Sequence, residues 1–248
     1  MSAISPPELS RNRMDNEKKI HIEHLLKSGQ FKGQKHQDRW VLFHVLPLLE
    51  YGFFLDLAAA DGITHSNTYV LEKHFGWGGL CIEPNPFFYK QLLDNRDCLA
   101  DSSVVSDNRE ILDFRIDNGQ LGGIVAEDTD NNSSTRGEQL SDATIISLQA
   151  KPINEILKDN KVPEVIDYFS LDVEGSEERI ISTIDSNSYQ FRCITIERPT
   201  EKVNEILFDN GYVFVRNVSF DTFYIHPSVL KETNIVCEKF EQVPKKNW

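Results

Sequence analysis

The sequence predicts an α/β fold built on a mainly parallel β-sheet with helices on both faces. Short apolar runs and helical segments alternate along most of the chain, which is typical of parallel strands joined by helices. Two closely spaced runs, at residues 212–215 and 220–225, predict an antiparallel strand at or near one edge. Ligands of such sheets bind beyond the carboxyl ends of the strands, so we expect the functional residues there.

The individual elements follow from apolar runs, helical periodicity and breaker residues. The expected strands lie at 53–57, 80–83, 99–106, 166–173 and 191–197, with two more in the middle of the chain at 110–116 and 144–148. The expected helices cover 66–75, 86–95, 152–158, 176–184 and 200–210. Residues 127–138 have almost no apolar side chain and are an expected long loop.

Two helical segments precede the first strand. The segment 15–27 stops near Gly29, and its candidate core contacts are Ile20, Ile22, Leu25 and Leu26. The segment 38–49 has a broad apolar stripe, although Pro47 disturbs its last turn. We therefore expect a helical extension over 1–49, an α/β domain over 50–230 and a polar tail over 231–248.

Composition excludes several classes of protein. The chain has 248 residues, 40% of them hydrophobic and 26% charged, as in ordinary globular proteins. Its net charge of −13 and the absence of a basic patch disfavour nucleic acid and anionic membranes as partners. Because no signal peptide or membrane span is readable, we expect a cytoplasmic protein. The widely spaced Cys81, Cys98, Cys193 and Cys237 predict free thiols and no zinc site.

The first candidate site is the end of the first strand. An acid and a run of small residues follow each other there: Asp56, Ala58, Ala60, Asp61 and Gly62. Small side chains let a ligand approach the backbone closely, and the acid can accept hydrogen bonds. The loop lacks the glycine pattern of a pyrophosphate cradle. A tight strand–helix turn without a ligand is the alternative interpretation.

The second candidate is Glu83, which follows the second strand. An acid at this position can accept hydrogen bonds from both hydroxyls of a ribose. An acid that interacts with the dipole of the following helix is the alternative.

The third candidate is the pair Asp172 and Glu174, after the strand at 166–173. Their spacing would put both carboxylates on one face of a continuing strand. They could orient a substrate hydroxyl, take its proton or hold a divalent cation. Alternatively, Glu174 caps the following helix.

These motifs together resemble the FkbM family of S-adenosylmethionine-dependent methyltransferases. The resemblance rests on Asp56 to Gly62, the pair Glu83-Pro84, and Asp172, Glu174 and Glu177, and it covers roughly residues 34–227. The ending at 220–225 also resembles the family's last strand. Ala58 and Ala60 stand where the family usually has glycine and often has asparagine, and alanine fits if the backbone there avoids positive φ.

The resemblance implies a Rossmann-like class I methyltransferase fold, with a seven-stranded sheet containing one antiparallel strand, and S-adenosyl-L-methionine as cofactor. By the same resemblance Asp56, Ala58, Asp61 and Gly62, with Ala60 in the same loop, line its methionine end. Glu83 holds the ribose, and Asp101, Ser102 and Ser103 meet the adenine. The implied acceptor is a hydroxyl on a small molecule, sugar or glycan.

Methyl transfer to a neutral hydroxyl is assisted by a base or a metal ion. The candidate bases are Asp172, Glu174, His65, Glu197 and His226, and we rank Asp172 first because it ends a strand inside the most specific motif. A divalent metal at Asp172 and Glu174 is possible but has no support in the sequence, since no histidine lies at ligand spacing nearby. Three other functions stay open: an NAD-dependent oxidoreductase, a non-catalytic nucleoside-binding or scaffold protein, and a methyltransferase acting on a macromolecule. The oligomeric state is not readable.

Overall fold

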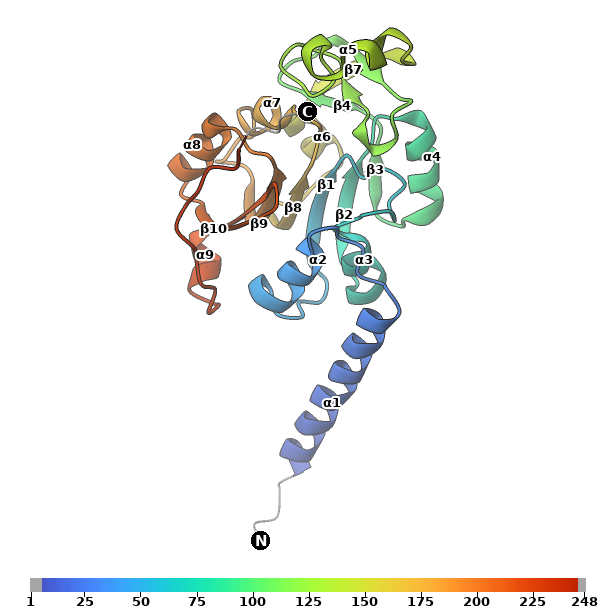
Figure 1. The fold of residues 1–248 in the computed structure, drawn as a ribbon. Helices are drawn as coiled ribbons and strands as arrows, with labels where there is room; N and C mark the ends of the chain where they lie inside the picture. The colour runs from blue at the N-terminus through green and yellow to red at the C-terminus, as the bar shows by residue number, and fades with distance from the viewer. Residues whose placement is uncertain (1–5, 245–248) are drawn as a thin grey trace.

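The main sheet has seven strands in the order β10-β11-β9-β8-β1-β2-β3 (Figure 1). The structure is a computed structural model that describes residues 6–244, with side-chain burial from residue 17 onward. The strands are β1 (Phe53–Leu57), β2 (Gly78–Ile82), β3 (Leu99–Asp101), β8 (Val165–Leu171), β9 (Gln190–Glu197), β10 (Val213–Val218) and β11 (Asp221–Ile225). Neighbouring strands are parallel except that β11 runs antiparallel to both β9 and β10. The predicted sheet with one antiparallel strand is therefore confirmed.

Helices cover both faces of this sheet, and each face has its own apolar core. Phe54 of β1 packs into one core and Leu55, one residue later, into the other, because successive side chains of a strand point to opposite faces. The first core contains residues of α3 (Tyr69–Phe75), α4 (Pro86–Asn95) and α9 (Pro227–Leu230). The second contains residues of α6 (Ile153–Asp159), α7 (Glu177–Ile181) and α8 (Glu201–Asp209).

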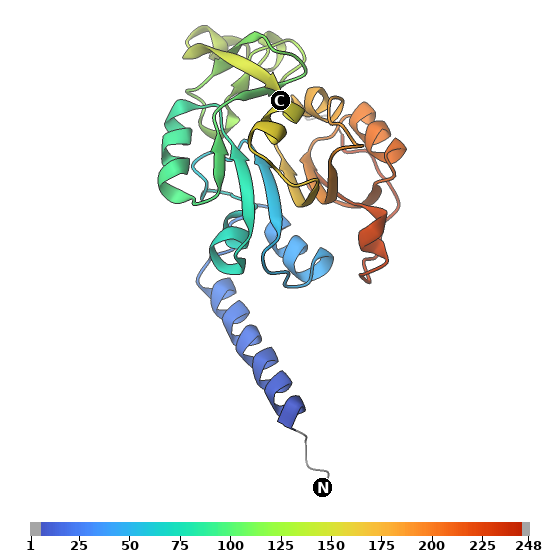
Figure 2. The same ribbon diagram turned by 180° about the vertical axis from the view of Figure 1, so that it is seen from behind.

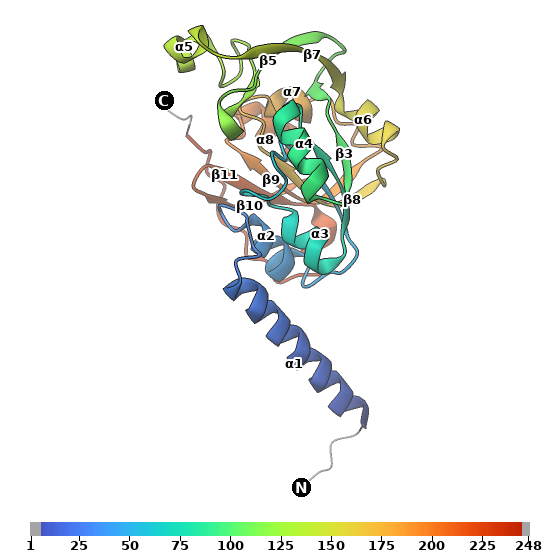
Figure 3. The ribbon, with the colours of Figure 1, turned by 90° about the vertical axis from the view of Figure 1, so that its right-hand side faces the viewer.

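The first helix, α1 (Pro6–Lys27), begins nine residues before the expected start and projects away from the body of the molecule (Figures 1 and 3). Of its four expected core contacts, Leu25 is buried, whereas Ile20 and Leu26 are 66% and 36% exposed. The expected stripe does not pack, because between residues 17 and 27 Leu25 alone is buried, Ile22 is half-buried and the other side chains are exposed.

The expected helix at 38–49 is shorter and irregular. The chain forms α2 (Gln37–Trp40) and then one π-helical turn, η1 (Val41–Val45). The N–H of Leu46 donates to the carbonyl of Val41, five residues back, and regular helix ends there. Pro47 has no N–H to continue the ladder, which explains the end.

A second, smaller sheet, which we did not expect, lies over the carboxyl-end edge of the main one (Figures 1 and 2). Its strand order is β4-β7-β5-β6, with β4 (Val104–Ser106), β5 (Ile111–Arg115), β6 (Gly123–Ile124) and β7 (Ile145–Pro152). The expected single strand at 99–106 is therefore divided between the two sheets. At the break the carboxylate of Asp101 accepts the N–H of Ser103 at 2.8 Å, a turn that redirects the chain.

The expected loop at 127–138 is wrong in its second half, which belongs to α5 (Ser133–Ser141). Asn132 caps this helix by accepting the N–H of Thr135, and Gly137 interrupts it with a φ of 23°. The sequence did not predict this helix, because the segment is polar and has no apolar face. Its start depends on the Asn132 cap.

The cysteines are free thiols, as expected, and Cys81 and Cys193 are buried. Within residues 6–244, no helix combines the length and the apolar character that a membrane crossing requires.

Candidate functional site

Acids from several strand ends lie around two adjoining cavities at the carboxyl-end edge of the sheet. Glu83 follows β2, Asp172 follows β8, and Glu197 ends β9. Glu83 lines one cavity, and Asp172 and Glu197 line the other. The two cavities share Leu57, Ala58 and Gln120. They are therefore separated by the end of β1 with its following loop, and by the side chain of Gln120, which lies between β5 and β6.

The first cavity is mostly apolar and holds about 600 Å³ of empty space, part of it open to solvent. We call it the apolar cavity. Its walls come from α4, the small sheet and α7, and include Phe88, Val105, Phe114, Ile124 and Ile180. Glu83 is the acid among its lining residues. The buried hydroxyl of Ser176, another lining residue, has no hydrogen-bond partner among the described residues.

Glu83 joins the loop after β1 to the end of β2. One carboxylate oxygen accepts the N–H of Ala60 and the other accepts the N–H of Asn85, each at 2.8 Å. Burial raises the pKa of Glu83 to about 7, although these two hydrogen bonds favour its ionised form. Each oxygen keeps a further lone pair, so the carboxylate can also accept two ligand hydroxyls.

The loop after β1 has the backbone conformation that we expected alanine to avoid. Ala58 and Ala60 have φ values of 61° and 48°, in the left-handed region that favours glycine. The loop is held there by the carbonyl of Ile82, which accepts the N–H groups of Ala58 and Ala59. The condition under which alanine would fit without strain is therefore not met at either position.

Asp61 and Gly62 support this loop and line neither cavity. The Asp61 carboxylate accepts the N–H groups of Ile63 and Thr64 and the Thr64 hydroxyl, and these bonds outweigh burial and lower its pKa. Gly62 has a φ of 78°, and a Cβ there would lie 2.6 Å from Cγ of Arg96. Both residues therefore support the conformation of the loop without lining a cavity.

Asp101 and Ser102 also line neither cavity, and their contact with the adenine stays a prediction. The Asp101 carboxylate accepts the side-chain amide of Asn160 at 3.1 Å, beyond β3, and Ser102 is exposed. The chain turns at this point to enter the small sheet, where Val104 and Val105 line the apolar cavity.

The second cavity is polar and rich in carboxylates, and we call it the acidic cavity. Its lining acids are Asp56, Asp172, Glu174, Glu197 and Asp221. Its other polar residues include Gln34, Lys35, Gln37, Thr64, His65, Ser66, Asn67, Gln120, Ser170 and Ser219. The two cavities thus differ in chemistry while they share one wall.

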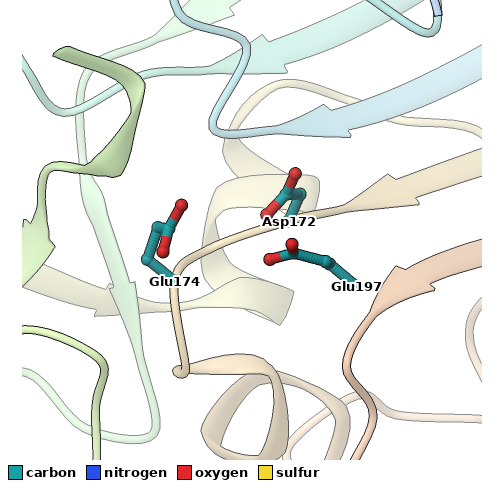
Figure 4. A group of neighbouring side chains, drawn as sticks. All are labelled: Asp172, Glu174 and Glu197. Atoms are coloured by element: carbon teal, nitrogen blue, oxygen red, sulfur yellow. The ribbon is translucent and has the colours of Figure 1, made fainter. Parts of the chain in front are cut away.

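Asp172, Glu174 and Glu197 point toward one another in this cavity (Figure 4). One ligand oxygen from each lies within 4.8 Å of the others. The expected proximity of Asp172 and Glu174 is therefore found, but β8 ends at Leu171, and Glu174 has a φ of 54°. A turn, rather than strand alternation, brings the two carboxylates together.

Two arginines compensate part of this negative charge. Arg198 lies 2.6 Å from a Glu197 oxygen, and Arg198 and Arg136 each lie 3.4 Å from the same oxygen of Glu174. Burial and repulsion by Glu197 still raise the pKa of Glu174 to about 8. Asp172 forms no ion pair with any residue from 17 to 244. Desolvation in the cleft and then the Glu197 and Glu174 charges raise its pKa well above the usual range.

Asp56 lies at the floor of the acidic cavity. Its carboxylate accepts the hydroxyl of Thr68 at 2.5 Å and interacts with that of Ser170. Burial raises its pKa. Asp56 thereby ties β1 to the start of α3 and to β8.

The two candidate histidines lie at opposite ends of the sheet. His65 is exposed at the rim of the acidic cavity, with Nδ1 2.7 Å from the Gln34 amide nitrogen and 2.8 Å from the Gln120 amide oxygen. His226 follows β11, which runs antiparallel, so it lies at the opposite edge. There its Nδ1 accepts the N–H of Ser228. His226 is thus too far along the strand to act as a base in either cavity.

Sequence reasoning missed Gln120, Asn67, Ser176 and Asp221 as lining residues. For Asp221 a signal existed. A strand that runs antiparallel begins at the edge where its parallel neighbours end, so its first residue belongs with the strand tips. Gln120 and Asn67 lie in loops whose path no local pattern reveals.

This chain is similar to several solved structures of low sequence identity. They include precorrin-6y C5,15-methyltransferase from Geobacter metallireducens, with 14% identity over 76% of this chain and 85% of that one and a TM-score of 0.39. Fibrillarin from Aeropyrum pernix, in complex with S-adenosyl-L-methionine, has 13% identity over 79% and 74%, with a TM-score of 0.42.

A methyltransferase FkbM from Methylobacillus flagellatus has 13% identity and a TM-score of 0.43, over 71% of this chain and 44% of that one. No curated protein matches the chain. The methyltransferase FkbM domain matches residues 56–224, from the acid of β1 to the last strand. This range contains the strand-end acids Glu83, Asp172 and Glu197, and the fold is the Rossmann-like class I fold expected from them. The chain therefore belongs to the FkbM family of methyltransferases.

Proposed function

We propose that this chain transfers the methyl group of S-adenosylmethionine to a hydroxyl of a small molecule, sugar or glycan. One observation carries the proposal: an apolar cavity with a hydroxyl-binding acid adjoins an acidic cavity, and they meet at Leu57, Ala58 and Gln120. In this proposal the nucleoside occupies the first cavity and the acceptor the second, with the reacting atoms between them.

The residues present fit this cofactor. The apolar walls suit a purine, the free lone pairs of Glu83 suit ribose hydroxyls, and the unpartnered Ser176 hydroxyl offers the purine a polar contact. The small side chains of Ala58 and Ala60 leave room beside the backbone. When bound, S-adenosylmethionine supplies an electrophilic methyl group and a positive charge on sulfur.

Asp172 is the proposed proton acceptor. A neutral hydroxyl becomes a better nucleophile when a nearby base takes its proton as the new bond forms. Desolvation and the neighbouring carboxylates make Asp172 more basic than an ordinary aspartate. A positive charge in the cavity would favour its ionised form, so a bound cationic ligand prepares the carboxylate for this role.

Glu197 and Glu174 have supporting roles in this proposal. Glu197 lies beside Asp172, so the two can share the proton that leaves the acceptor. Glu174, held by Arg136 and Arg198, fixes the turn after Asp172. His65 remains a candidate for orienting the acceptor. Its Nδ1 contacts Gln34 and Gln120, so its Nε2 is the ring nitrogen that could contact a ligand.

A divalent cation is the alternative way to activate the hydroxyl. Asp172, Glu174 and Glu197 offer the oxygen ligands that Mg²⁺ and Ca²⁺ prefer. Arg198 and Arg136, however, already lie against Glu197 and Glu174, and a cation would have to displace or repel them. We therefore propose base catalysis without a metal.

Isothermal titration calorimetry tests the cofactor directly. We expect S-adenosylhomocysteine to bind with a dissociation constant below about 1 mM and NAD not to bind, since the chain lacks a glycine-rich pyrophosphate loop. Binding of NAD in place of S-adenosylhomocysteine would favour the oxidoreductase. Binding of S-adenosylhomocysteine without methylation of any acceptor in a broad screen with labelled cofactor would favour a non-catalytic protein.

A further inference from the structure

The far end of the acidic cavity is formed by residues that the proposed methyl transfer leaves unused. Gln37 begins α2, and Phe220 and Asp221 form the entry into β11. Gln37 and Asp221 are both buried, 3% and 8% exposed, and both line the cavity. A buried carboxylate at such a position is costly unless a partner satisfies it.

Gln37 satisfies half of the Asp221 carboxylate. Its side-chain amide donates to Oδ1 of Asp221 at 3.1 Å, and its own carbonyl oxygen accepts the N–H of Lys35 at 2.9 Å. The Gln37 amide is thereby fixed from both sides, and it holds one oxygen of the Asp221 carboxylate. Oδ2 of Asp221 accepts no hydrogen bond from residues 17 to 244. The second oxygen is left for a ligand that donates a hydrogen bond.

The sheet places this oxygen at a useful distance from the proposed base. Asp221 is the direct cross-strand partner of Glu197, and the Glu197 carboxylate lies within 4.8 Å of that of Asp172. Because β9 separates β8 from β11, Asp172 and Asp221 lie two strand spacings apart, roughly 10 Å at the backbone. Side chains that reach into one cavity from this separation can hold two groups of a single sugar-sized ring.

The charge of the cavity restricts what can bind there. The carboxylates that line it are those of Asp56, Asp172, Glu174, Glu197 and Asp221. Among the described lining residues, Lys35 is the one lysine, and no arginine lines the cavity. Arg136 and Arg198 compensate two of these carboxylates, and burial raises the pKa of others, so a phosphate or carboxylate group would be repelled by the carboxylates that remain ionised in this partly desolvated space. Phe220, 36% exposed, adds an apolar ring at the same end.

We propose that Asp221, held by Gln37, orients the acceptor by accepting a hydrogen bond from a second hydroxyl, and that the acidic cavity selects neutral polyhydroxyl molecules over phosphorylated or carboxylated ones. The inference rests on the proposed function, because it assigns the acidic cavity to the acceptor. Asp221 is a positioning residue for the acceptor, and Asp172 remains the proton acceptor.

A panel of acceptors tests the selectivity on the unaltered protein. Hexoses, deoxyhexoses and inositol are each supplied beside their monophosphates, with labelled S-adenosylmethionine. We expect methylation of at least one neutral polyol, and a rate at least about ten-fold lower for its phosphate. Equal rates for the matched pair would overturn the selectivity. The selectivity would also be overturned if the protein binds S-adenosylhomocysteine but methylates no neutral polyol. If the protein does not bind S-adenosylhomocysteine, the proposed function itself is refuted.

The Asp221→Asn variant tests the residue. With the best polyol of the panel we expect KM to rise roughly ten-fold and kcat to change less than about two-fold, with unchanged affinity for S-adenosylhomocysteine. Asp113→Asn, an exposed change in the small sheet outside both cavities, is the matched control and should leave KM unaltered. An unaltered KM in Asp221→Asn, or a parallel loss of cofactor affinity, would show that Asp221 merely anchors α2. If this variant does not fold, the selectivity of the unaltered protein still decides the proposal.

Discussion

The apolar and the acidic cavities share one loop yet handle carboxylates in different ways. In the apolar cavity Glu83 is buried among apolar groups, and both of its oxygens already accept backbone N–H groups. In the acidic cavity Asp172 and its neighbours are close enough to repel one another, and arginines compensate Glu174 and Glu197. Burial raises the pKa of Glu83, whereas desolvation inside the cleft and repulsion by Glu197 and Glu174 raise that of Asp172.

This difference separates recognition from reactivity. Glu83 is held in place by bonds that exist before any ligand arrives, so it can present fixed acceptors to two hydroxyls. Asp172 has no ionic partner among residues 17–244, so its charge depends on what enters the cavity. A preorganised acceptor suits a cofactor that is always the same, and a responsive acid suits a proton transfer.

The strongest test of the comparison is Asp172→Asn. Asparagine keeps the shape but cannot take a proton, so we expect kcat to fall by about 10²–10⁴ while S-adenosylhomocysteine binds as before. Single-turnover rates and calorimetry measure the two quantities, and Asp113→Asn serves as the control. Turnover near that of the unaltered enzyme would remove Asp172 from the chemistry.

Glu83→Gln tests the recognition side. Glutamine cannot accept both the Ala60 and the Asn85 N–H, so we expect affinity for S-adenosylhomocysteine to fall about 10- to 100-fold. Asp101→Asn is the matched comparison, since Asp101 contacts Asn160 and lines neither cavity. Equal losses in the two variants would contradict the geometry, because they would place the nucleoside near the end of β3.

The strand tips were predictable because the decisive signals are local. Apolar runs that end in an acid mark where a buried strand meets solvent, and Glu83, Asp172 and Glu197 follow from that rule. The bounds of α4 match the expectation, since Pro86 occupies its first turn and Asn85 accepts the N–H of Phe87. Caps and turns of this kind depend on neighbours in sequence.

The remaining features depend on contacts between distant residues. The path of the chain after Asp101 is decided by a turn and by pairing of β4 with β7, nearly fifty residues later, so the position of Asp101 and Ser102 outside both cavities could not be read from the sequence. The Arg136 and Arg198 contacts with Glu174 likewise join separate segments. His226 is different, because its position could have been predicted. An antiparallel strand was expected there, and the end of such a strand lies at the edge of the sheet opposite the strand-end acids.

Stability should depend on pH through the same buried acids. The pKa of Glu83 and Glu177 is raised by burial to about 7, and that of Glu174 to about 8, from an ordinary value of 4.5. Between 4.5 and these values the unfolded chain ionises while the folded chain keeps its protons, so the folded state loses stability as pH rises. The loss is on the order of 3 kcal/mol for each fully buried group.

Urea unfolding of the unliganded protein at pH 5.5, 7 and 8.5 measures this trend. We expect the free energy of unfolding to fall across the series, and to fall less in Glu83→Gln, which cannot ionise at that position. Stability that rises over the same range would mean that these acids are ionised and paired in the folded protein.

A smaller effect is expected at the loop that both cavities share. Ala58 adopts a left-handed φ of 61°, which costs about 1 kcal/mol or more for a residue with a Cβ. In Ala58→Gly this strain disappears, while the greater freedom of glycine in the unfolded chain costs about 0.4–1 kcal/mol. We expect a net gain of up to about 1 kcal/mol in the free energy of unfolding. Ala59→Gly, next to it and without positive φ, should lose stability, and similar changes in both variants would contradict the strain.

The smallest expected effect is that of a chelator, which should leave the methylation rate unchanged. Arg198 lies 2.6 Å from Glu197, and Arg198 and Arg136 contact Glu174, so two of the three carboxylates that could hold a cation are already compensated by positive charge. A divalent ion that bound there would have to lose water ligands, and the guanidinium groups would repel it. Rates measured with EDTA, and again after adding Mg²⁺ or Mn²⁺ in excess, check this. A rate that EDTA abolishes and a metal restores would make the acidic cavity a metal site and Asp172 a ligand, and Asp172→Asn would then lose metal affinity together with turnover.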